Sequence, residues 1–220
     1  MTRYDALLIV SFGGPEKQED VIPFLENVLR GRNVPRERML AVAEHYYHFG
    51  GHSPINDQCR ALISALETAG VGLPIYWGNR NWHPMLADTV RQMRNNGVRS
   101  ALAIATSAFG SYSGCRQYRE DIEKARAAVE GAPVIEKLPP FWDHSGFIGT
   151  MIERIREALA RVPGAEVVYT AHSIPVSMAQ GSPYEEQLRE AASRVNRALG
   201  MGAPVLAFQS RSGPPSQSWL

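Results

Sequence analysis

The sequence predicts an α/β protein built from parallel, doubly wound sheets. Short apolar runs alternate along the chain with longer segments whose apolar residues recur at helical spacing. The run at 6–10, A-L-L-I-V, is apolar throughout, which indicates a strand buried on both faces of a parallel sheet. Hydrophobic residues make up 44% and charged residues 20% of the 220 positions, which is typical of a soluble globular protein.

The predicted elements follow one another in a regular order. The first half is expected to hold strands at 6–10, 73–78, 100–106 and 134–138, and helices at 16–29, 36–49, 57–69, 85–95 and 119–129. The second is expected to hold helices at 147–161 and 185–199, and strands at 167–169 and 204–210. We therefore predict two Rossmann-like halves, at 1–145 and 146–220. No helix follows the last strand, so we expect the chain to stop short of its natural C-terminus and the second half to be incomplete.

The composition argues against several classes of protein. A formal net charge of +1 gives no basic excess for binding nucleic acid. No apolar run approaches the roughly 20 residues of a membrane span, and the first residues do not form a signal peptide. The two cysteines, Cys59 and Cys115, are too few for a disulfide framework and fit no zinc motif, so we expect a cytoplasmic protein.

His172 is the first candidate for chemistry. The run Val167-Val168-Tyr169 predicts a strand, and Pro175 ends the stretch that follows, so His172 is expected just past the carboxyl end of the strand. Ligands of open α/β sheets bind beyond those ends, and a neutral imidazole there can bind a metal or accept a proton. A purely structural histidine that bonds to its neighbours is an equally good interpretation.

Three more segments hold candidate residues. Phe12 lies in a glycine turn after the first strand, where it can face a ligand or the core; this turn lacks the G-x-G-x-x-G nucleotide fingerprint. Arg30 lies in a basic turn that can serve a ligand or only favour a helix C-terminus. Tyr46 and Ser53 belong to an aromatic helix end and a glycine loop, which suit either a flat apolar ligand or an aromatic core cluster.

Seven segments together resemble the ferrochelatase family, and specifically the actinobacterial coproporphyrin III ferrochelatases. They run in the family's order and cover essentially the whole chain. The segments are S-F-G-G-P-E at 11–16, F-L-E-N-V-L-R-G-R at 24–32, E-H-Y-Y-H-F-G-G-H-S-P-I-N at 44–56, G-N-R-N-W at 78–82, A-T-S-A-F-G-S-Y-S-G-C-R-Q-Y at 105–118, Y-T-A-H-S-I-P at 169–175 and Q-S-R-S-G-P-P at 209–215.

The resemblance implies a chelatase-like fold and a function. Family members are lyase-class enzymes of haem biosynthesis that insert ferrous iron into a porphyrin, at a cleft between two Rossmann-like halves. It implies that His172 is the metal ligand and catalytic proton acceptor. The implied porphyrin contacts are Ser53, Tyr118, Phe12, Tyr46 and Arg30. Coproporphyrin III and Fe²⁺ are the implied substrates, and a monomer is the implied state.

The chain also departs from the family pattern. Phe12 stands where some relatives have a tyrosine that reaches the iron, and a phenylalanine has no oxygen to donate. The family's catalytic glutamate lies downstream of 209–215, beyond Leu220. Some relatives hold a [2Fe-2S] cluster, for which Cys115 matches the internal ligand; a cluster takes about four ligands, so none is expected in this chain alone. The alternative function is a non-catalytic tetrapyrrole-binding fragment.

Overall fold

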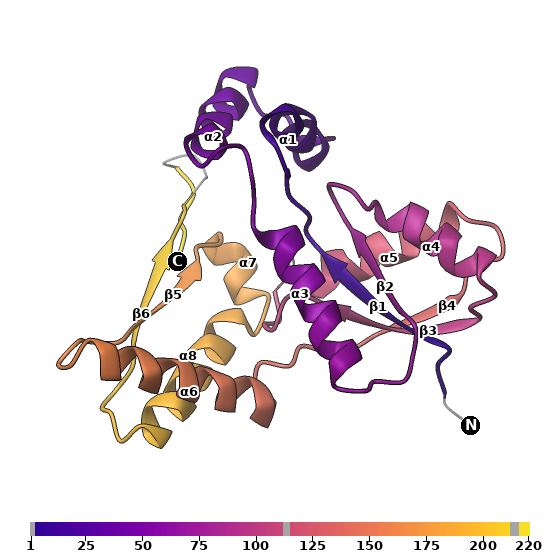
Figure 1. The fold of residues 1–220 in the computed structure, drawn as a ribbon. Helices are drawn as coiled ribbons and strands as arrows, with labels where there is room; N and C mark the ends of the chain where they lie inside the picture. Colours follow the sequence, from indigo (N-terminus) through magenta and orange to yellow (C-terminus); the bar gives the residue numbers. More distant parts are fainter. Residues whose placement is uncertain (1–2, 112–114, 212–215) are drawn as a thin grey trace. The chain divides into compact units, whose positions relative to one another are not determined.

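The computed structural model describes residues 3–111, 115–211 and 216–220. The chain divides into two compact units (Figure 1). Met1–Thr106 and Tyr118–Leu138 form the first unit, and Ser107–Gln117 and Pro139–Leu220 form the second. The predicted halves at 1–145 and 146–220 stay a prediction. Parts of two family-like segments, 112–114 and 212–215, lie outside the described residues.

The first unit contains a four-stranded parallel sheet in the order β2-β1-β3-β4. Its strands are β1 (Ala6–Ser11), β2 (Ile75–Asn79), β3 (Ser100–Ala105) and β4 (Val134–Lys137). Strand β1 is central, with Leu8 opposite both Tyr76 and Ala103. Every residue of β1 is buried, which confirms the prediction made from its continuous apolar run.

Helices cover both faces of this sheet (Figure 1). The helices of this unit are α1 (Val21–Leu29), α2 (Arg36–His48), α3 (Ile55–Thr68), α4 (Leu86–Asn95) and α5 (Gln117–Ala127), of which α3, α4 and α5 pack on the sheet. Helix α3 lies on one face, where Arg60 stacks over Trp77 of β2, and α4 and α5 lie on the other. Helices α1 and α2 pair beyond the carboxyl end of β1. The predicted doubly wound α/β architecture is confirmed in this unit.

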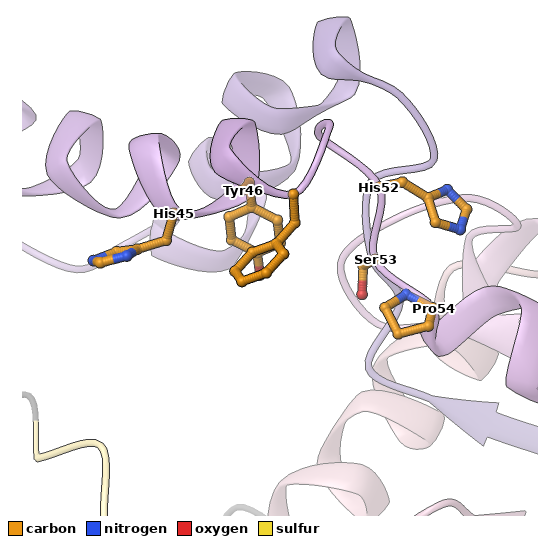
Figure 2. Close-up of a pocket in the computed structure, with 6 residues that line it drawn as sticks. His45, Tyr46, His52, Ser53 and Pro54 are labelled. Carbon is orange, nitrogen blue, oxygen red and sulfur yellow. The ribbon is translucent and has the colours of Figure 1, made fainter.

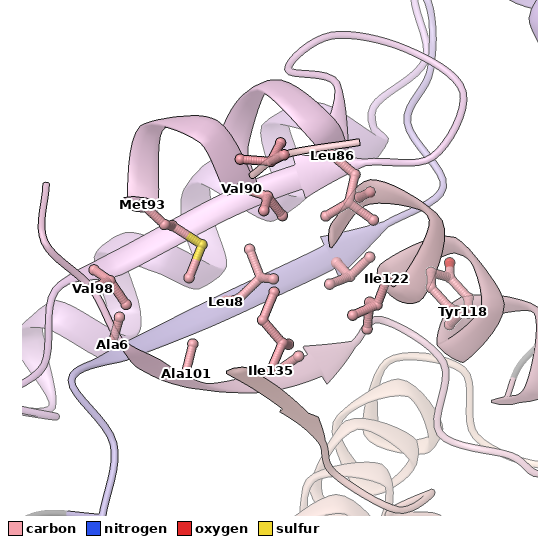
Figure 3. Close-up of a cluster of buried hydrophobic side chains, with 14 of the residues drawn as sticks. Ala6, Leu8, Leu86, Val90, Met93, Val98, Ala101, Tyr118, Ile122 and Ile135 are labelled. Atoms are coloured by element: carbon pink, nitrogen blue, oxygen red, sulfur yellow. The ribbon is translucent and has the colours of Figure 1, made fainter. Parts of the chain in front are cut away.

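The main core lies between the sheet and helices α4 and α5 (Figure 3). Leu8 of β1 meets Val90 and Met93 of α4 and Ile122 of α5, and all four are at most 2% exposed. A smaller cluster joins α1 to α2, with Phe24 packed against Met39 and Ala43. The smaller cluster supports the aromatic helix end that carries Tyr46.

The described residues of the second unit form a two-stranded parallel sheet and the helices that pack with it. The strands are β5 (Val168–His172) and β6 (Val205–Gln209), and the helices are α6 (Ser145–Arg161), α7 (Val176–Gln180) and α8 (Tyr184–Ala198). Helix α8 buries Leu188, Ala191 and Val195. Its Asn196 accepts a hydrogen bond of 2.7 Å from the hydroxyl of Tyr169, which fastens the helix to β5.

One helix begins later than the sequence predicts. The segment expected to be helical from residue 16 forms a short 3₁₀ turn, η1 (Gln18–Asp20), and only then α1. The Asp20 carboxylate accepts a hydrogen bond from the Glu16 amide at 3.1 Å, which stabilises the turn. Pro23 has no amide proton and fits only in a first helical turn, and a start at Val21 places it there.

The segment around His172 also differs from its prediction. Strand β5 continues through Thr170 and Ala171, which pair with Ala207 and Phe208 of β6, so His172 ends the strand and does not lie beyond it. Helix α7 was not predicted, because the proline before it was interpreted only as a stop signal. Among the described residues, no helix combines the length and the apolar character needed to cross a bilayer.

We expect Leu8→Ala to destabilise the first unit strongly. Leu8 is fully buried against α4 and α5, and truncating a leucine at such a site removes about 2–5 kcal/mol of stability. Urea unfolding followed by circular dichroism measures the loss. Leu40→Ala on α2, where the leucine is 41% exposed, is the matched control, with an expected change of about 0.5 kcal/mol or less. Equal losses in the two variants would contradict the assigned core.

Candidate functional site

Two buried asparagines organise the carboxyl edge of the first sheet. Asn56 begins α3, Asn79 ends β2, and neither is exposed to solvent. The Asn79 amide donates to the Asn56 side-chain oxygen at 3.2 Å and to the His83 carbonyl at 2.9 Å. The Asn56 amide donates to the Gly14 carbonyl at 3.3 Å and to the Glu16 carboxylate at 2.9 Å. These bonds join the loops after β1 and β2 to the start of α3.

The loop after β1 and the loop before α3 are in close contact. The Ser53 amide donates to the Pro15 carbonyl at 2.8 Å. A Cβ atom added at Gly14 would lie 2.7 Å from the Cβ and Oγ atoms of Ser53. At Gly51, whose φ is +74°, an added Cβ would lie 2.5 Å from the Gln18 Cα. Moving the two loops apart would break the hydrogen bond from Ser53 to Pro15, and moving them closer would bring Gly14 into Ser53.

An apolar cavity of about 480 Å³ opens beside this loop pair (Figure 2). Its lining residues are His45, Tyr46, Phe49, His52, Ser53 and Pro54. The sequence predicted Tyr46 and Ser53 as substrate contacts, and the structure brings both to this cavity. Phe49 is 75% exposed, so its ring is available to a ligand. The size and the aromatic wall suit a flat apolar molecule with a few polar groups.

Tyr46 is anchored from behind by the smaller core cluster. The ring of Phe24 packs edge-on against Tyr46, with centroids 5.8 Å apart, and against Phe12 at 6.1 Å. Burial raises the pKa of the Tyr46 hydroxyl, so that group stays protonated at neutral pH. The sequence left open whether these aromatics face a ligand or the core, and Tyr46 does both: it packs on Phe24 and lines the cavity.

Phe12 and Tyr118 are linked by a buried arginine that the sequence analysis did not single out. The Arg80 guanidinium lies 5.6 Å from the Phe12 ring centroid and 4.8 Å from that of Tyr118. Its Nε donates to the Asp121 carboxylate at 2.5 Å, and the Arg80 side chain is only 7% exposed. The arginine lies within the family-like segment G-N-R-N-W at 78–82, which was the available signal.

Tyr118 is part of the main core and is 5% exposed. Burial raises the pKa of its hydroxyl, and this outweighs the opposing effects of Arg80 and Thr106. Arg30 is exposed at the end of α1, where its guanidinium hydrogen-bonds the Asn27 side chain. Neither residue is among those that line the cavity, and a porphyrin contact by either stays a prediction.

His172 lies in the second unit, at the end of β5 and opposite Gln209 of β6. Its side chain is exposed, while its carbonyl accepts a hydrogen bond of 3.1 Å from the Tyr184 hydroxyl. Ser173, next in the chain, is buried and donates to the Leu220 carbonyl at 2.7 Å. The backbone around His172 is thus held by α8 and by residues 218–220, and its imidazole is accessible to a metal or a proton.

The cysteines do not complete a cluster site. Cys59 is buried on α3, Cys115 is partly exposed in the second unit, and the sequence has only these two. A [2Fe-2S] cluster takes about four ligands, so the thiols of this chain do not fit one. Within the described ranges, no group of three or more histidine, cysteine or acidic side chains could hold a metal ion.

A second cavity, of about 810 Å³, lies in the second unit beside α8. Trp142 and the charged side chains of α8 line it, including Glu190 and Arg194, which form an ion pair at 2.9 Å. The Arg194 guanidinium also stacks over the Trp142 ring at 5.2 Å. None of the predicted site residues lines this cavity, and its charges largely neutralise one another.

Comparisons with known proteins confirm the predicted resemblance. A family model described as Ferrochelatase matches residues 4–220. The protein named Ferrochelatase of Rhodopirellula baltica is 57% identical over 226 residues, which cover 99% of this chain and 64% of the relative. Proteins named Coproporphyrin III ferrochelatase, of Nocardia farcinica and Frankia alni, are each 52% identical over 98% of this chain. The chain spans 66% and 60% of their lengths.

We expect Asp121→Ala to destabilise the first unit by about 2 kcal/mol. The substitution leaves the Arg80 guanidinium buried without its carboxylate, and the partial exposure of Asp121, 26%, moderates the loss. Urea unfolding measures it. Asp88→Ala removes the partner of an exposed ion pair with Arg91 and should change stability by about 0.5 kcal/mol or less. If the two variants are equally stable, Arg80 does not depend on Asp121.

Proposed function

Because the chain belongs to the ferrochelatase family, we propose that its protein is a lyase-class enzyme that inserts ferrous iron into coproporphyrin III during haem biosynthesis. The observation that carries the proposal is the family model's match to residues 4–220. Two relatives that are 52% identical have coproporphyrin III in their names, which supports that porphyrin as the substrate.

The apolar cavity of the first unit supplies the porphyrin wall in this proposal. The rings of Tyr46 and Phe49 offer an apolar surface to the flat macrocycle, and the Ser53 hydroxyl can hydrogen-bond a propionate group. Arg30 offers an exposed guanidinium for a second propionate. Phe12 and Tyr118 complete the proposed set, held together by Arg80.

His172 handles the metal and a proton in the proposed reaction. Insertion of Fe²⁺ requires that two pyrrole N–H protons leave while four nitrogens bind the metal, so the porphyrin releases two protons for each iron taken up. An exposed imidazole can bind the incoming cation or accept one of these protons. The hydrogen bond from the Tyr184 hydroxyl to the His172 carbonyl holds the backbone that carries this imidazole.

The proposal also covers the substrates, the cofactors, the oligomeric state and the cellular compartment. Fe²⁺ and the porphyrin are substrates, and no iron–sulfur cluster is assigned to this chain. We infer a monomer that works in the cytoplasm, where the two cysteines would stay reduced.

The proposal is tested by titrating this chain with coproporphyrin III, monitored by Soret absorbance, and then adding Fe²⁺ without oxygen. We expect saturable binding, followed by insertion in a form of the protein that also carries the family's downstream glutamate. In His172→Ala, insertion should fall by about 100-fold or more, because general acid–base catalysis contributes that much. Porphyrin binding and the circular dichroism spectrum should not change, since the side chain is exposed.

His144→Asn, at another exposed histidine, is the control and should insert iron like the parent protein, because asparagine can still cap α6. Normal insertion by His172→Ala would contradict the role of His172. Binding without insertion, even in the form that carries the glutamate, would favour a non-catalytic tetrapyrrole-binding role. A folded chain that binds no porphyrin would overturn the proposal.

We expect Ser53→Ala to weaken coproporphyrin III binding by about fivefold, the effect of one lost hydrogen bond. The rate of insertion at saturating porphyrin should stay close to that of the parent chain, because Ser53 is not assigned to the metal or the proton. Thr68→Ala on α3 removes a hydroxyl that bonds only within its helix, and it should leave the affinity unchanged. Unaltered affinity in Ser53→Ala would remove this residue from the porphyrin wall.

A further inference from the structure

His52 precedes Ser53, and each nitrogen of its ring lies within hydrogen-bond distance of an acceptor. Its Nδ1 lies 3.1 Å from the Glu16 carbonyl oxygen, and its Nε2 lies 2.8 Å from the Asp57 carboxylate. Figure 2 shows its ring on the side of the loop opposite Tyr46. The imidazole therefore bridges the loop after β1 and the first turn of α3, and His52 is also among the residues that line the cavity.

Both partners of the imidazole are hydrogen-bond acceptors. A neutral histidine has one N–H donor, so it can satisfy only one of them, and its other nitrogen then faces an acceptor. A protonated histidine donates to both. The bridge observed at His52 is consequently complete only when the imidazole carries a positive charge.

The surrounding charges form a balanced group of four. Arg60, one turn further along α3, donates to the Asp57 carboxylate at 2.7 Å and forms a short ion pair with the Glu16 carboxylate. With His52 protonated, two cations face two carboxylates. When His52 loses its proton, the group has a net negative charge, and Asp57 keeps only Arg60 as a positively charged partner.

Ser53 is in direct contact with the same loop that His52 bonds, so a shift of that loop reaches Ser53. The Ser53 amide bonds to Pro15, the residue before Glu16, and the Ser53 side chain fits against Gly14 with no room for a Cβ. Gly51 also has no room for a Cβ, because that atom would lie 2.5 Å from the Gln18 Cα. Any shift of the loop after β1 that weakens the His52–Glu16 bond must therefore displace the Ser53 hydroxyl from its place in the cavity wall.

We propose that His52 is a positioning residue, which in its protonated form fastens the Ser53 loop to Glu16 and Asp57 and so sets the affinity of the cavity for a carboxylate-bearing porphyrin. This inference rests on the proposed function, since it takes a porphyrin as the cavity's ligand. The ligand contact belongs to Ser53, and His52 acts through it.

The electrostatics of the bridge agree with this role. The bond to the Glu16 carbonyl, followed by the bond to Asp57, raises the pKa of His52 above its usual value near 6.5. The pKa of Asp57 is lowered, first by His52 and also by Arg60. A group with a raised folded pKa stabilises the structure below its unfolded pKa, and this effect is lost as pH rises through the folded pKa. Porphyrin affinity should fall over that same range.

The test measures the dissociation constant of coproporphyrin III between pH 6 and pH 9 at constant ionic strength. In the parent chain, affinity should fall by about threefold as pH rises, the scale of one partly exposed ion pair. His52→Gln cannot titrate, so it should bind about threefold more weakly at pH 6 and lack this step. Asp57→Asn should move the step to lower pH, because the carboxylate no longer favours the imidazolium.

His144→Asn is the control, since His144 is exposed at the start of α6 and is not among the residues that line the cavity, and asparagine can still cap that helix. It should keep the step of the parent chain. Identical pH profiles in the parent chain and His52→Gln would overturn the inference, as would a step that disappears in His144→Asn.

A porphyrin-free measurement separates this inference from the proposed function. In nuclear magnetic resonance spectra, the Ser53 amide should shift with the same midpoint as the His52 ring, and this shift should be absent in His52→Gln. If that coupling holds while no porphyrin binds, the proposed function fails and the positioning role stands. If porphyrin binds but the chemical shift of the Ser53 amide does not follow the protonation of His52, only the positioning role is overturned.

Discussion

The buried side-chain amides of Asn56 and Asn79 are the constraint on which the shape of the first unit's cavity depends. An amide shielded from water must find hydrogen-bond partners within the protein, or its burial becomes unfavourable. The partners available here are backbone and side-chain oxygens of the loops that follow β1 and β2 and the start of α3. Satisfying two amides therefore fixes three segments at once. This arrangement also shapes the cavity, because Ser53 lines the cavity and its amide bonds to Pro15 in the loop after β1.

The alternation of strands and helices could be predicted because burial on both faces leaves an unmistakable pattern, as in β1. The errors occur where a local bond competes with the pattern. The first helix was predicted to start at residue 16 because Pro15 can begin a helix, but Pro23 and the Asp20 carboxylate favour a later start. Strand β5 was predicted too short because Thr170 and Ala171 are not an apolar pair, although partners in β6 extend the strand to His172.

The candidate site was predictable in part. Tyr46 and Ser53 were found through the family-like segment at 44–56, and the structure places both on one cavity. The role of Arg80 was not predictable, because its partners Phe12, Tyr118 and Asp121 are distant in sequence and only the fold assembles them. Nothing in the residue types shows that Tyr118 is buried under a guanidinium, since its neighbours in the chain are polar. Apolar periodicity therefore predicts buried strands well, but it does not predict which side chains that are distant in sequence contact one another.

The path of the chain between the two units has a consequence for synthesis on the ribosome. The chain leaves the first unit at Ser107, passes through 107–117 of the second, and returns for 118–138. The first core lacks Ile122 and Ile135 until that return is complete, so β1 to β3 emerge while only α4 can cover the face of the sheet that α4 and α5 share. Residues 107–117 then wait for 139–220, a delay on the order of ten seconds at about 5–20 residues per second. The two units therefore cannot fold strictly one after the other during synthesis, because each contains residues that follow part of the other in the chain.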